Sequence, residues 1–257
     1  MFIDSHAHQS MLIQERNISS DQIIKELKEK SVLTVLNISG NDKELDHALS
    51  LNEIFKSNGI KLFHAAGVHP HEAEKASEDY TWIRNSSSKI LAIGEVGLDF
   101  YYDFSPEKNQ EKVFRSMIEL SIELEKPLII HGRSAEKRAV NIIKEYGNDL
   151  KVLFHCYTGD MKTALEIVET GWLISFSGIL TFKKSTDFHE ILKTIGISKV
   201  LFETDSPFLA PVPFRGKVNT PAKVFHVYDF ASKLFEIDIN EIAKTVSNNF
   251  NDFFGVK

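Results

Sequence analysis

The sequence has little of three things: cysteine, excess positive charge and long apolar runs. The single cysteine, Cys156, excludes a disulfide framework within the chain and a cysteine-type zinc site, so a reducing cytoplasm is the expected setting. The formal net charge of -6 argues against a protein that coats nucleic acid along a broad basic face. A nucleic acid substrate stays open, because bound cations can supply positive charge locally. No apolar run approaches ~20 residues and no signal peptide pattern is present, so we expect no membrane association.

Low-complexity tracts, charge blocks and linker-like stretches are also missing, which predicts a single domain over residues 1–257. Short apolar segments alternate with amphipathic ones from end to end. Segments that are apolar on both faces, as parallel strands covered by helices must be, predict strands near Phe2–His6, Val32–Ile38, Leu62–Gly67, Ile90–Glu95, Pro127–His131, Val152–His155, Trp172–Ser175 and Val200–Glu203. The amphipathic segments predict helices near Ser20–Lys30, Asp42–Lys56, Tyr80–Ser86, Glu107–Lys126, Glu136–Tyr146, Met161–Glu169, Asp187–Ile195 and Pro221–Leu234.

Eight strand–helix repeats are typical of a closed (β/α)8 barrel of the TIM type, an α/β fold. The rival interpretation is an open, doubly wound parallel sheet. An extra helix near Ile239–Phe250 follows the last repeat. We therefore predict a single-domain barrel with an added C-terminal helix.

Histidine and carboxylate side chains stand where these strands should end. In a barrel of this type the chemistry gathers at the C-terminal ends of the strands. The residues at or just beyond those ends are His6, His8, His69, His71, Glu95, His131, His155 and Asp205. Any one of these histidines alone would more often be a satisfied core or loop residue. Their coincidence at the ends of several strands, together with carboxylates that are costly to bury unless paired or metal-bound, indicates a metal site.

Four histidines and two carboxylates exceed the three or four ligands of one tetrahedral zinc. They predict two divalent cations, roughly 3.5–4 Å apart and bridged by a carboxylate and a water. Glu95 is the expected bridge, and Asp205 is expected to orient the attacking water and take its proton. One ion would be held by His6, His8 and Asp205, and the other by His131 and His155.

The same residues lie in stretches that resemble the TatD family of metal-dependent deoxyribonucleases, within the amidohydrolase-like barrels. The matching stretches are DSHAH (4–8), GVHPHEA (67–73), GEVGLDFYY (94–102), KPLIIHGRSA (126–135), HCYTG (155–159), ETDSPFLAPVPFRGKVNTP (203–221) and SNNF (247–250). Ser134 and Tyr157-Thr158 depart from residues that family members often carry, but neither touches a proposed ligand.

The resemblance implies phosphodiester hydrolysis, typically of DNA from the 3′ end, with magnesium or manganese activating the enzyme. Single-stranded DNA or 3′ ends are the expected partner, and no obligate protein partner is inferred. The resemblance places metal ligands at His6, His8, Glu95, His131, His155 and Asp205. Histidine also favours zinc, so the isolated protein is expected to carry zinc in some preparations.

Several further residues are candidates for the substrate site. Arg215, in Arg215-Gly216-Lys217, could fork onto phosphate oxygens or be a solvated basic turn. Arg133 could hold a phosphate or pair with a carboxylate, and His69 could contact substrate. Glu203 could ligate a metal, bond to a ligand or assist as a base.

The aromatic run Phe100-Tyr101-Tyr102 could stack nucleobases or simply pack. Cys156 is interpreted as structural. Four further histidines fall inside predicted helices or a strand and are assigned no function: His47, His64, His189 and His226.

Two other functions stay open. An amide or ester hydrolase of the wider barrel group could act on aminoacyl-tRNA or a small cyclic amide. Many such relatives bridge their metals with a carboxylated lysine, whereas the bridge expected here is Glu95, which favours the nuclease. A catalytically silent metal-binding or scaffold protein would be expected to lack a ligand, and none is missing from the sequence.

Overall fold

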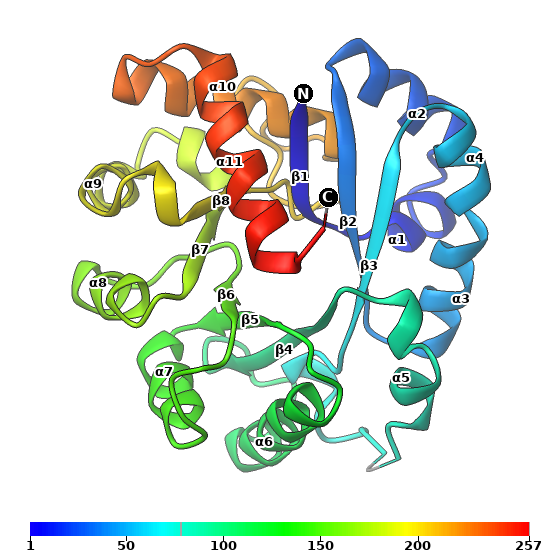
Figure 1. Cartoon of the computed structure of the whole chain (residues 1–257), viewed down its shortest axis with the longest axis vertical. Helices are drawn as coiled ribbons and strands as arrows, with labels where there is room; N and C mark the ends of the chain where they lie inside the picture. The colour runs from blue at the N-terminus through cyan, green and yellow to red at the C-terminus, as the bar shows by residue number, and fades with distance from the viewer. Residues whose placement is uncertain (78, 257) are drawn as a thin grey trace.

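The structure is a computed structural model and describes residues 1–77 and 79–256. Its eight strands pair in parallel, in the order β1-β2-β3-β4-β5-β6-β7-β8. Figure 1 shows them around a common axis with the helices outside. The chain just beyond β8 pairs with the end of β1. Ala7 forms a β-bridge with Ser206, and the His8 N–H donates to the Ser206 carbonyl at 2.8 Å. The predicted (β/α)8 barrel is confirmed, and the open-sheet alternative is wrong.

The elements have the following bounds. The strands are β1 (Phe2–Ala7), β2 (Val32–Ser39), β3 (Lys61–Ala66), β4 (Ala92–Asp99), β5 (Leu128–Arg133), β6 (Val152–Phe154), β7 (Leu173–Phe176) and β8 (Val200–Phe202). The α-helices are α1 (Gln9–Gln14), α2 (Ser20–Glu29), α3 (Asp42–Ser50), α4 (Asn52–Ser57), α5 (Thr81–Asn85), α6 (Glu107–Glu123), α7 (Glu136–Lys144), α8 (Met161–Glu169), α9 (Thr186–Ile195), α10 (Val224–Phe235) and α11 (Ile239–Phe254). Short 3-10 turns are η1 (Pro70–Glu72), η2 (Ser87–Lys89), η3 (Gly178–Thr181), η4 (Ile197–Lys199) and η5 (Pro221–Lys223).

Local sequence explains several of these boundaries. The Ser19 hydroxyl accepts from the Gln22 N–H at the start of α2, and the Asp160 carboxylate accepts from the Thr163 N–H at the start of α8. Such side chains satisfy backbone donors that have no partner within the first helical turn. Gly196 follows α9 with a φ of 70°, a conformation that glycine adopts without a steric cost.

Two predicted boundaries are wrong in ways that bear on the site. The helix predicted over 42–56 is two helices, because the N–H of Leu51 bonds to the carbonyl of Ala48, one residue short of the α-helical partner. The fourth strand continues past Glu95 to Asp99, because its last residues stay paired with β5, up to Asp99 opposite Arg133. Helix α1, directly after His8, was not predicted.

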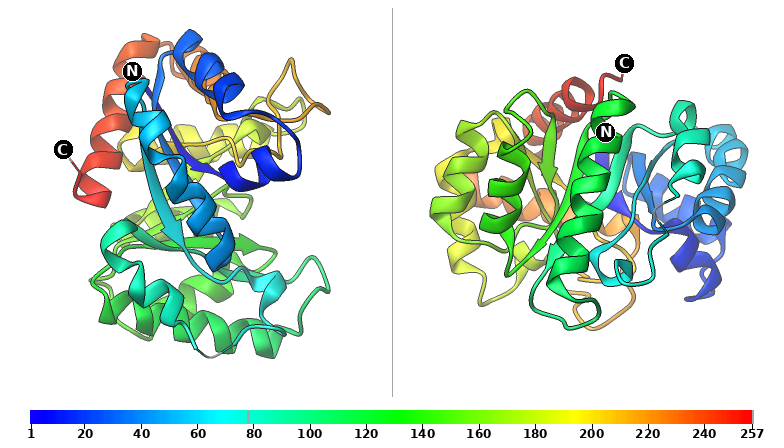
Figure 2. Two further views of the ribbon diagram at one scale, coloured as in Figure 1. Left: turned by 90° about the vertical axis from the view of Figure 1, so that its right-hand side faces the viewer. Right: turned by 90° about the horizontal axis from the view of Figure 1, so that it is seen from below.

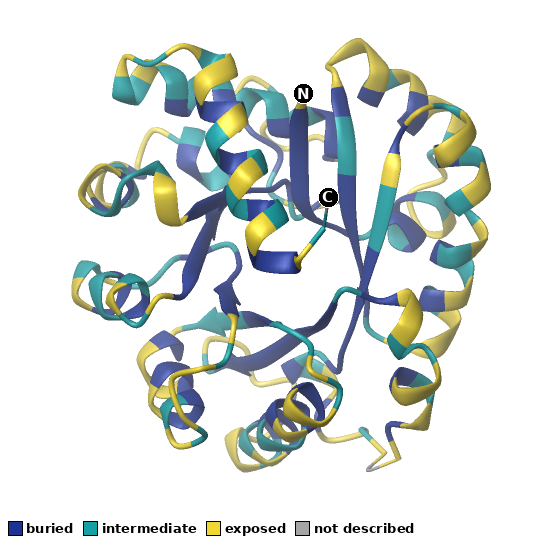
Figure 3. Cartoon of the chain, viewed as in Figure 1, coloured by how far each residue is buried: buried dark blue, intermediate teal, exposed yellow. Residues whose placement is uncertain are grey.

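The core lies between the barrel and the inner faces of its helices, where Figure 3 shows buried segments on the strands. Every residue of β1 and of β4 is buried. On α2 the buried positions are Ile23, Ile24 and Leu27, the spacing of one helical face. The site residues at the strand ends are therefore held on closely packed elements.

Helix α11 covers the end of the barrel where the strands begin. The Asn249 amide donates to the carbonyls of Ile197 and Val200, at the start of β8. The loops that follow β3 (cyan) and β8 (orange) project on the side away from α11 (Figure 2). The opposite end is thus open for a site. Among the described residues, no helix combines the length and apolarity needed to cross a membrane.

Candidate metal centre

The six predicted ligands converge at the open end of the barrel. His6 lies on β1, Glu95 on β4 and His131 on β5. His8 and His155 directly follow β1 and β6, and Asp205 lies in the loop after β8. Glu95 lies at the centre of this set. Its Oε2 is 3.4 Å from His6 Nε2, and its Oε1 is 2.6 Å from both His131 Nδ1 and His155 Nε2. Side chains from distant parts of the sequence therefore meet around one carboxylate.

One group of ligands is formed by β1 and the loop after β8. His6 Nε2 and His8 Nε2 lie 3.3 Å apart. Asp205 Oδ1 is 3.8 Å from the first and 3.5 Å from the second. The Asp4 carboxylate on β1 accepts hydrogen bonds from the N–H and the hydroxyl of Thr204, next to Asp205 in the chain. These bonds hold the two segments of this ligand group together.

The second group is formed by β4, β5 and the end of β6. His131 Nδ1 and His155 Nε2 lie 3.3 Å apart, and both face Glu95 Oε1. Ligand nitrogens bound to one tetrahedral zinc at about 2.0–2.1 Å lie roughly 3.3–3.4 Å from each other. Both nitrogen pairs in this centre therefore have the separation of neighbouring metal ligands, and the donor set fits divalent cations.

The electrostatics of the centre are consistent with cation binding. Burial alone would raise the pKa of the Glu95 carboxyl, but the imidazoles of His155 and His69 hold it well below its ordinary value. Burial alone would lower the pKa of His155, but the carboxylates of Glu95 and Glu203 raise it well above its ordinary value. The buried carboxylates are thus stable only beside positive charge, which bound cations supply.

Two buried carboxylates hold the other nitrogens of the second group. Asp99 Oδ2 lies 3.3 Å from His131 Nε2, and Glu203 Oε1 lies 3.2 Å from His155 Nδ1. The Ser175 hydroxyl donates to Glu203 at 2.5 Å. Carboxylates in such positions orient metal-binding imidazoles. The geometry suits this role for Glu203, which does not border the cavity described below.

Asp99 was not predicted from the sequence. Its signal was the all-buried run of β4, which ends in a carboxylate four residues beyond Glu95. Gly97 allows this part of β4 to run against β5, because a Cβ on Gly97 would lie only 2.1 Å from the His131 carbonyl oxygen. The position of Asp99 therefore depends on close contact between two strands.

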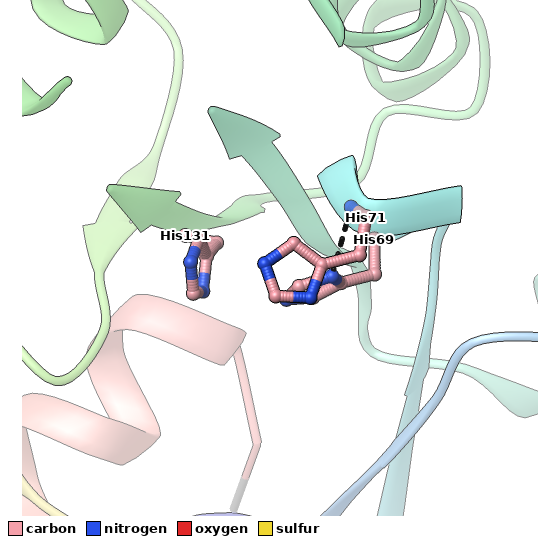
Figure 4. Close-up of side chains that lie close together, drawn as sticks. All are labelled: His69, His71 and His131. Carbon is pink, nitrogen blue, oxygen red and sulfur yellow. Dashed lines mark hydrogen bonds between the residues drawn. The ribbon is translucent and has the colours of Figure 1, made fainter. Parts of the chain in front are cut away.

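His69 and His71 lie beside the second group, as Figure 4 shows with His131. The His71 N–H donates to His69 Nδ1 at 3.1 Å, and His71 Nε2 donates to Asp99 Oδ2 at 2.7 Å. Burial is the main cause that lowers the pKa of His69 to about 4, so its ring is neutral and carries its proton on Nε2. His69 thereby presents a donor near Glu95 Oε1, 3.5 Å away.

A cavity of about 960 Å³ opens onto the centre. Its lining includes His8, His69, Glu95, Arg133 and Asp205. The Arg133 guanidinium lies over the rings of Tyr101 and Tyr102, and no ion pair joins it to any carboxylate among the described residues. Of the two predicted roles of Arg133, pairing with a carboxylate has no support among the described residues, and phosphate binding stays a prediction.

The structure does not bring every predicted substrate residue to this cavity. Arg215 is outside its lining, and its guanidinium stacks over the ring of Phe182 with 4.6 Å to the ring centre. The phosphate-binding role predicted for Arg215 gains no support from this placement. Cys156 is half-buried, with its Sγ 3.0 Å from the Ser177 hydroxyl.

Comparisons with known proteins show which family and which fold the chain resembles. A family model described as "TatD related DNase" matches residues 3–255. The chain is 34% identical to the uncharacterized metal-dependent hydrolase YabD of Bacillus subtilis, with 100% of both chains covered. It is also 34% identical to the uncharacterized metal-dependent hydrolase BU355 of Buchnera aphidicola, with 99% of each covered. The crystal structure of YJJV, a TatD homolog from Escherichia coli, matches with a TM-score of 0.89 and 23% identity, covering 100% of this chain and 98% of that one, and so supports the fold.

Proposed function

The chain belongs to the TatD related DNase family of metal-dependent hydrolases, and on that premise we propose that it cleaves phosphodiester bonds of DNA with two divalent cations. The expected substrate is single-stranded DNA or a 3′ end, degraded from 3′ to 5′. Magnesium or manganese would support turnover, and zinc would compete for the histidine ligands.

The position of Glu95 carries this proposal. Its Oε2 faces His6 and His8, at 3.4 and 3.8 Å, while its Oε1 faces His131 and His155. A carboxylate whose two oxygens point at two separate histidine pairs has the arrangement of a bridge between two ions. When bound there, the cations would polarise the phosphate and lower the pKa of a water.

The remaining groups have separate proposed tasks. Asp205 borders the cavity and would orient the water and accept its proton. His69, through its Nε2–H, and Arg133, whose guanidinium has no ion pair among the described residues, would donate to phosphate oxygens. Glu203 would position His155 rather than exchange protons with substrate, because it is fully buried behind that ring.

The test is a degradation ladder with end-labelled oligonucleotides of DNA and RNA, run with magnesium, manganese or zinc. A small cyclic amide and an aminoacyl ester are assayed in parallel. We expect shortening of the DNA from its 3′ end, and a loss on the order of a thousandfold in Glu95→Gln. Turnover of the amide or ester without strand cleavage would overturn the proposal in favour of the wider hydrolase group.

A further inference from the structure

The exposed aromatic side chains of this protein are gathered in one place. Among the described residues, the exposed aromatics are Tyr101 (62%), Tyr102 (41%), Phe104 (60%) and Phe208 (43%). Tyr102 and Phe208 line the cavity over the metal centre, and Tyr101 and Phe104 each pack against Tyr102. Exposed apolar surface that is clustered rather than scattered marks an interaction site. Of the aromatic run that follows Glu95, Phe100 packs against the core, whereas Tyr101 and Tyr102 contact each other and Arg133 and stay exposed.

The loop that carries three of these rings is fixed in place. Asp99 Oδ1 accepts from the N–H groups of Tyr101 and Tyr102, each at 3.0 Å. The Gln110 amide donates to the carbonyls of Asp99 and Ser105, so it holds the loop at both ends. The rings are thus presented to solvent by an ordered backbone, and little freedom would be lost when a ligand binds to them.

The rings form a continuous path to the metal centre. Tyr101 and Tyr102 have ring centres 4.9 Å apart, and Tyr102 and Phe104 have ring centres 5.4 Å apart. The ring centres of Phe104 and His71 are 4.6 Å apart. Arg133, which also lines the cavity, lies over both tyrosines, with its guanidinium carbon 4.3 and 4.6 Å from the ring centres, so a cationic donor stands beside the rings.

We propose that Tyr101, Tyr102 and Phe104 form an aromatic platform that stacks unpaired nucleobases of the strand whose phosphodiester lies at the metal centre. This inference rests on the nuclease activity proposed above and names how the strand is held. Aromatic rings stack on bases of any sequence, because every base has a π-face. Three neighbouring rings offer stacking surfaces for planar bases, and the Arg133 guanidinium beside two of them offers a donor for a phosphate.

The rest of the molecule limits how much nucleic acid can bind. The net charge is -6, so no extended basic surface would track a long strand. The cavity of about 960 Å³ is at the upper end of the roughly 300–1,000 Å³ typical of small-molecule sites. The platform therefore fits the last few nucleotides of a strand, and bases paired in a duplex would have to separate before they stacked.

The experiment compares oligonucleotides that differ only by an abasic residue placed at each position near the 3′ end in turn. Every phosphate is kept, so a loss reports the missing base. The variants are Tyr102→Leu, which keeps apolar bulk without a ring, and Tyr102→Phe, which keeps the ring. Ile122→Ala, an exposed apolar residue on α6 outside this cavity, is the matched control. Strand binding is measured separately by fluorescence anisotropy in a Glu95→Gln background that does not turn over.

We expect an abasic residue at one position to raise the wild-type KM, and the anisotropy Kd, roughly tenfold with little change in kcat. In Tyr102→Leu, KM and Kd for the intact strand should already be raised to the same extent, and the abasic residue should raise them no further. Tyr102→Phe and Ile122→Ala should have the wild-type values. Equal KM and Kd for intact and abasic strands at every position would overturn the platform while leaving the nuclease proposal intact. Absence of cleavage by the wild type would overturn the nuclease proposal, and the anisotropy comparison would still decide the platform.

Discussion

At the scale of single residues, three buried carboxylates have different positions and roles at the metal centre. Glu95 lies between the two histidine pairs, while Asp99 and Glu203 face the far nitrogens of His131 and His155. An imidazole can bind a metal through one nitrogen only if the other is held in the matching tautomer and direction. The arrangement of this centre is therefore set as much by the supporting carboxylates as by the ligands.

Asp99→Asn tests whether the Asp99 carboxylate positions His131 for metal binding. The amide oxygen can still accept from the loop N–H groups, but the negative charge facing His131 and His71 is lost. We expect manganese or zinc affinity, measured by calorimetric titration, to fall roughly 10- to 100-fold. The control is Asp79→Asn, which removes a carboxylate from the lining of the same cavity away from the ligands. Equal affinities in the two variants would contradict a positioning role for Asp99.

At the scale of elements, the pairing of β4 with β5 decides where the second group of ligands lies. Gly97 is opposite His131 in this pairing, with a φ of 142°. A side chain there would meet the backbone of β5, not a flexible side chain that could move aside. The position of His131 at the open end of the barrel thus depends on Gly97, which has no side chain.

Gly97→Ala is expected to destabilise the fold by roughly 2–4 kcal/mol and to weaken metal binding, because β4 and β5 must separate. Gly147→Ala is the matched control, since Gly147 also has a positive φ of 104° but nothing lies within 4 Å of the added Cβ. That variant should lose only about 1–2 kcal/mol and keep its metal affinity. Urea unfolding and metal titration measure both effects. Equal losses in the two variants would show that backbone conformation, and not the strand contact, is the cause.

At the scale of the whole molecule, folding buries an ionisable group away from the metal centre. His64, on β3, is 2% exposed, and its Nε2 donates to the Asn52 side chain of α4. Burial lowers its pKa to about 4. The folded protein therefore keeps this ring neutral under conditions in which the unfolded chain, with an ordinary pKa of about 6.5, takes up a proton.

This difference makes the folded state less stable as the pH falls through the window from about 6.5 to about 4. Between pH 7 and pH 5 we expect His64 to account for a loss of roughly 2 kcal/mol in the free energy of unfolding. Urea unfolding of the wild type and of His64→Gln at both pH values isolates this part, because glutamine does not titrate. Between the two pH values, the free energy of unfolding of His64→Gln should fall by roughly 2 kcal/mol less than that of the wild type. Identical losses in the two proteins would exclude His64 as the source.

The succession of strands and helices, and the placement of the candidate ligands at strand ends, could be predicted from the amino-acid sequence alone. Apolar periodicity reveals which segments are buried, and a chemical group at the end of such a segment is visible without coordinates. The family motifs around His6, Glu95 and Asp205 strengthened this prediction. The barrel and the convergence of six candidate ligands followed from that pattern.

Which atoms face one another became visible only in the folded chain. The continuation of β4 to Asp99, the placement of Glu203 behind His155, the exposure of Tyr102 and the absence of Arg215 from the cavity were not readable from the sequence. The physical reason is that these facts depend on strand register and loop conformation. Both are set by contacts between segments far apart in the chain, and local periodicity carries no information about them.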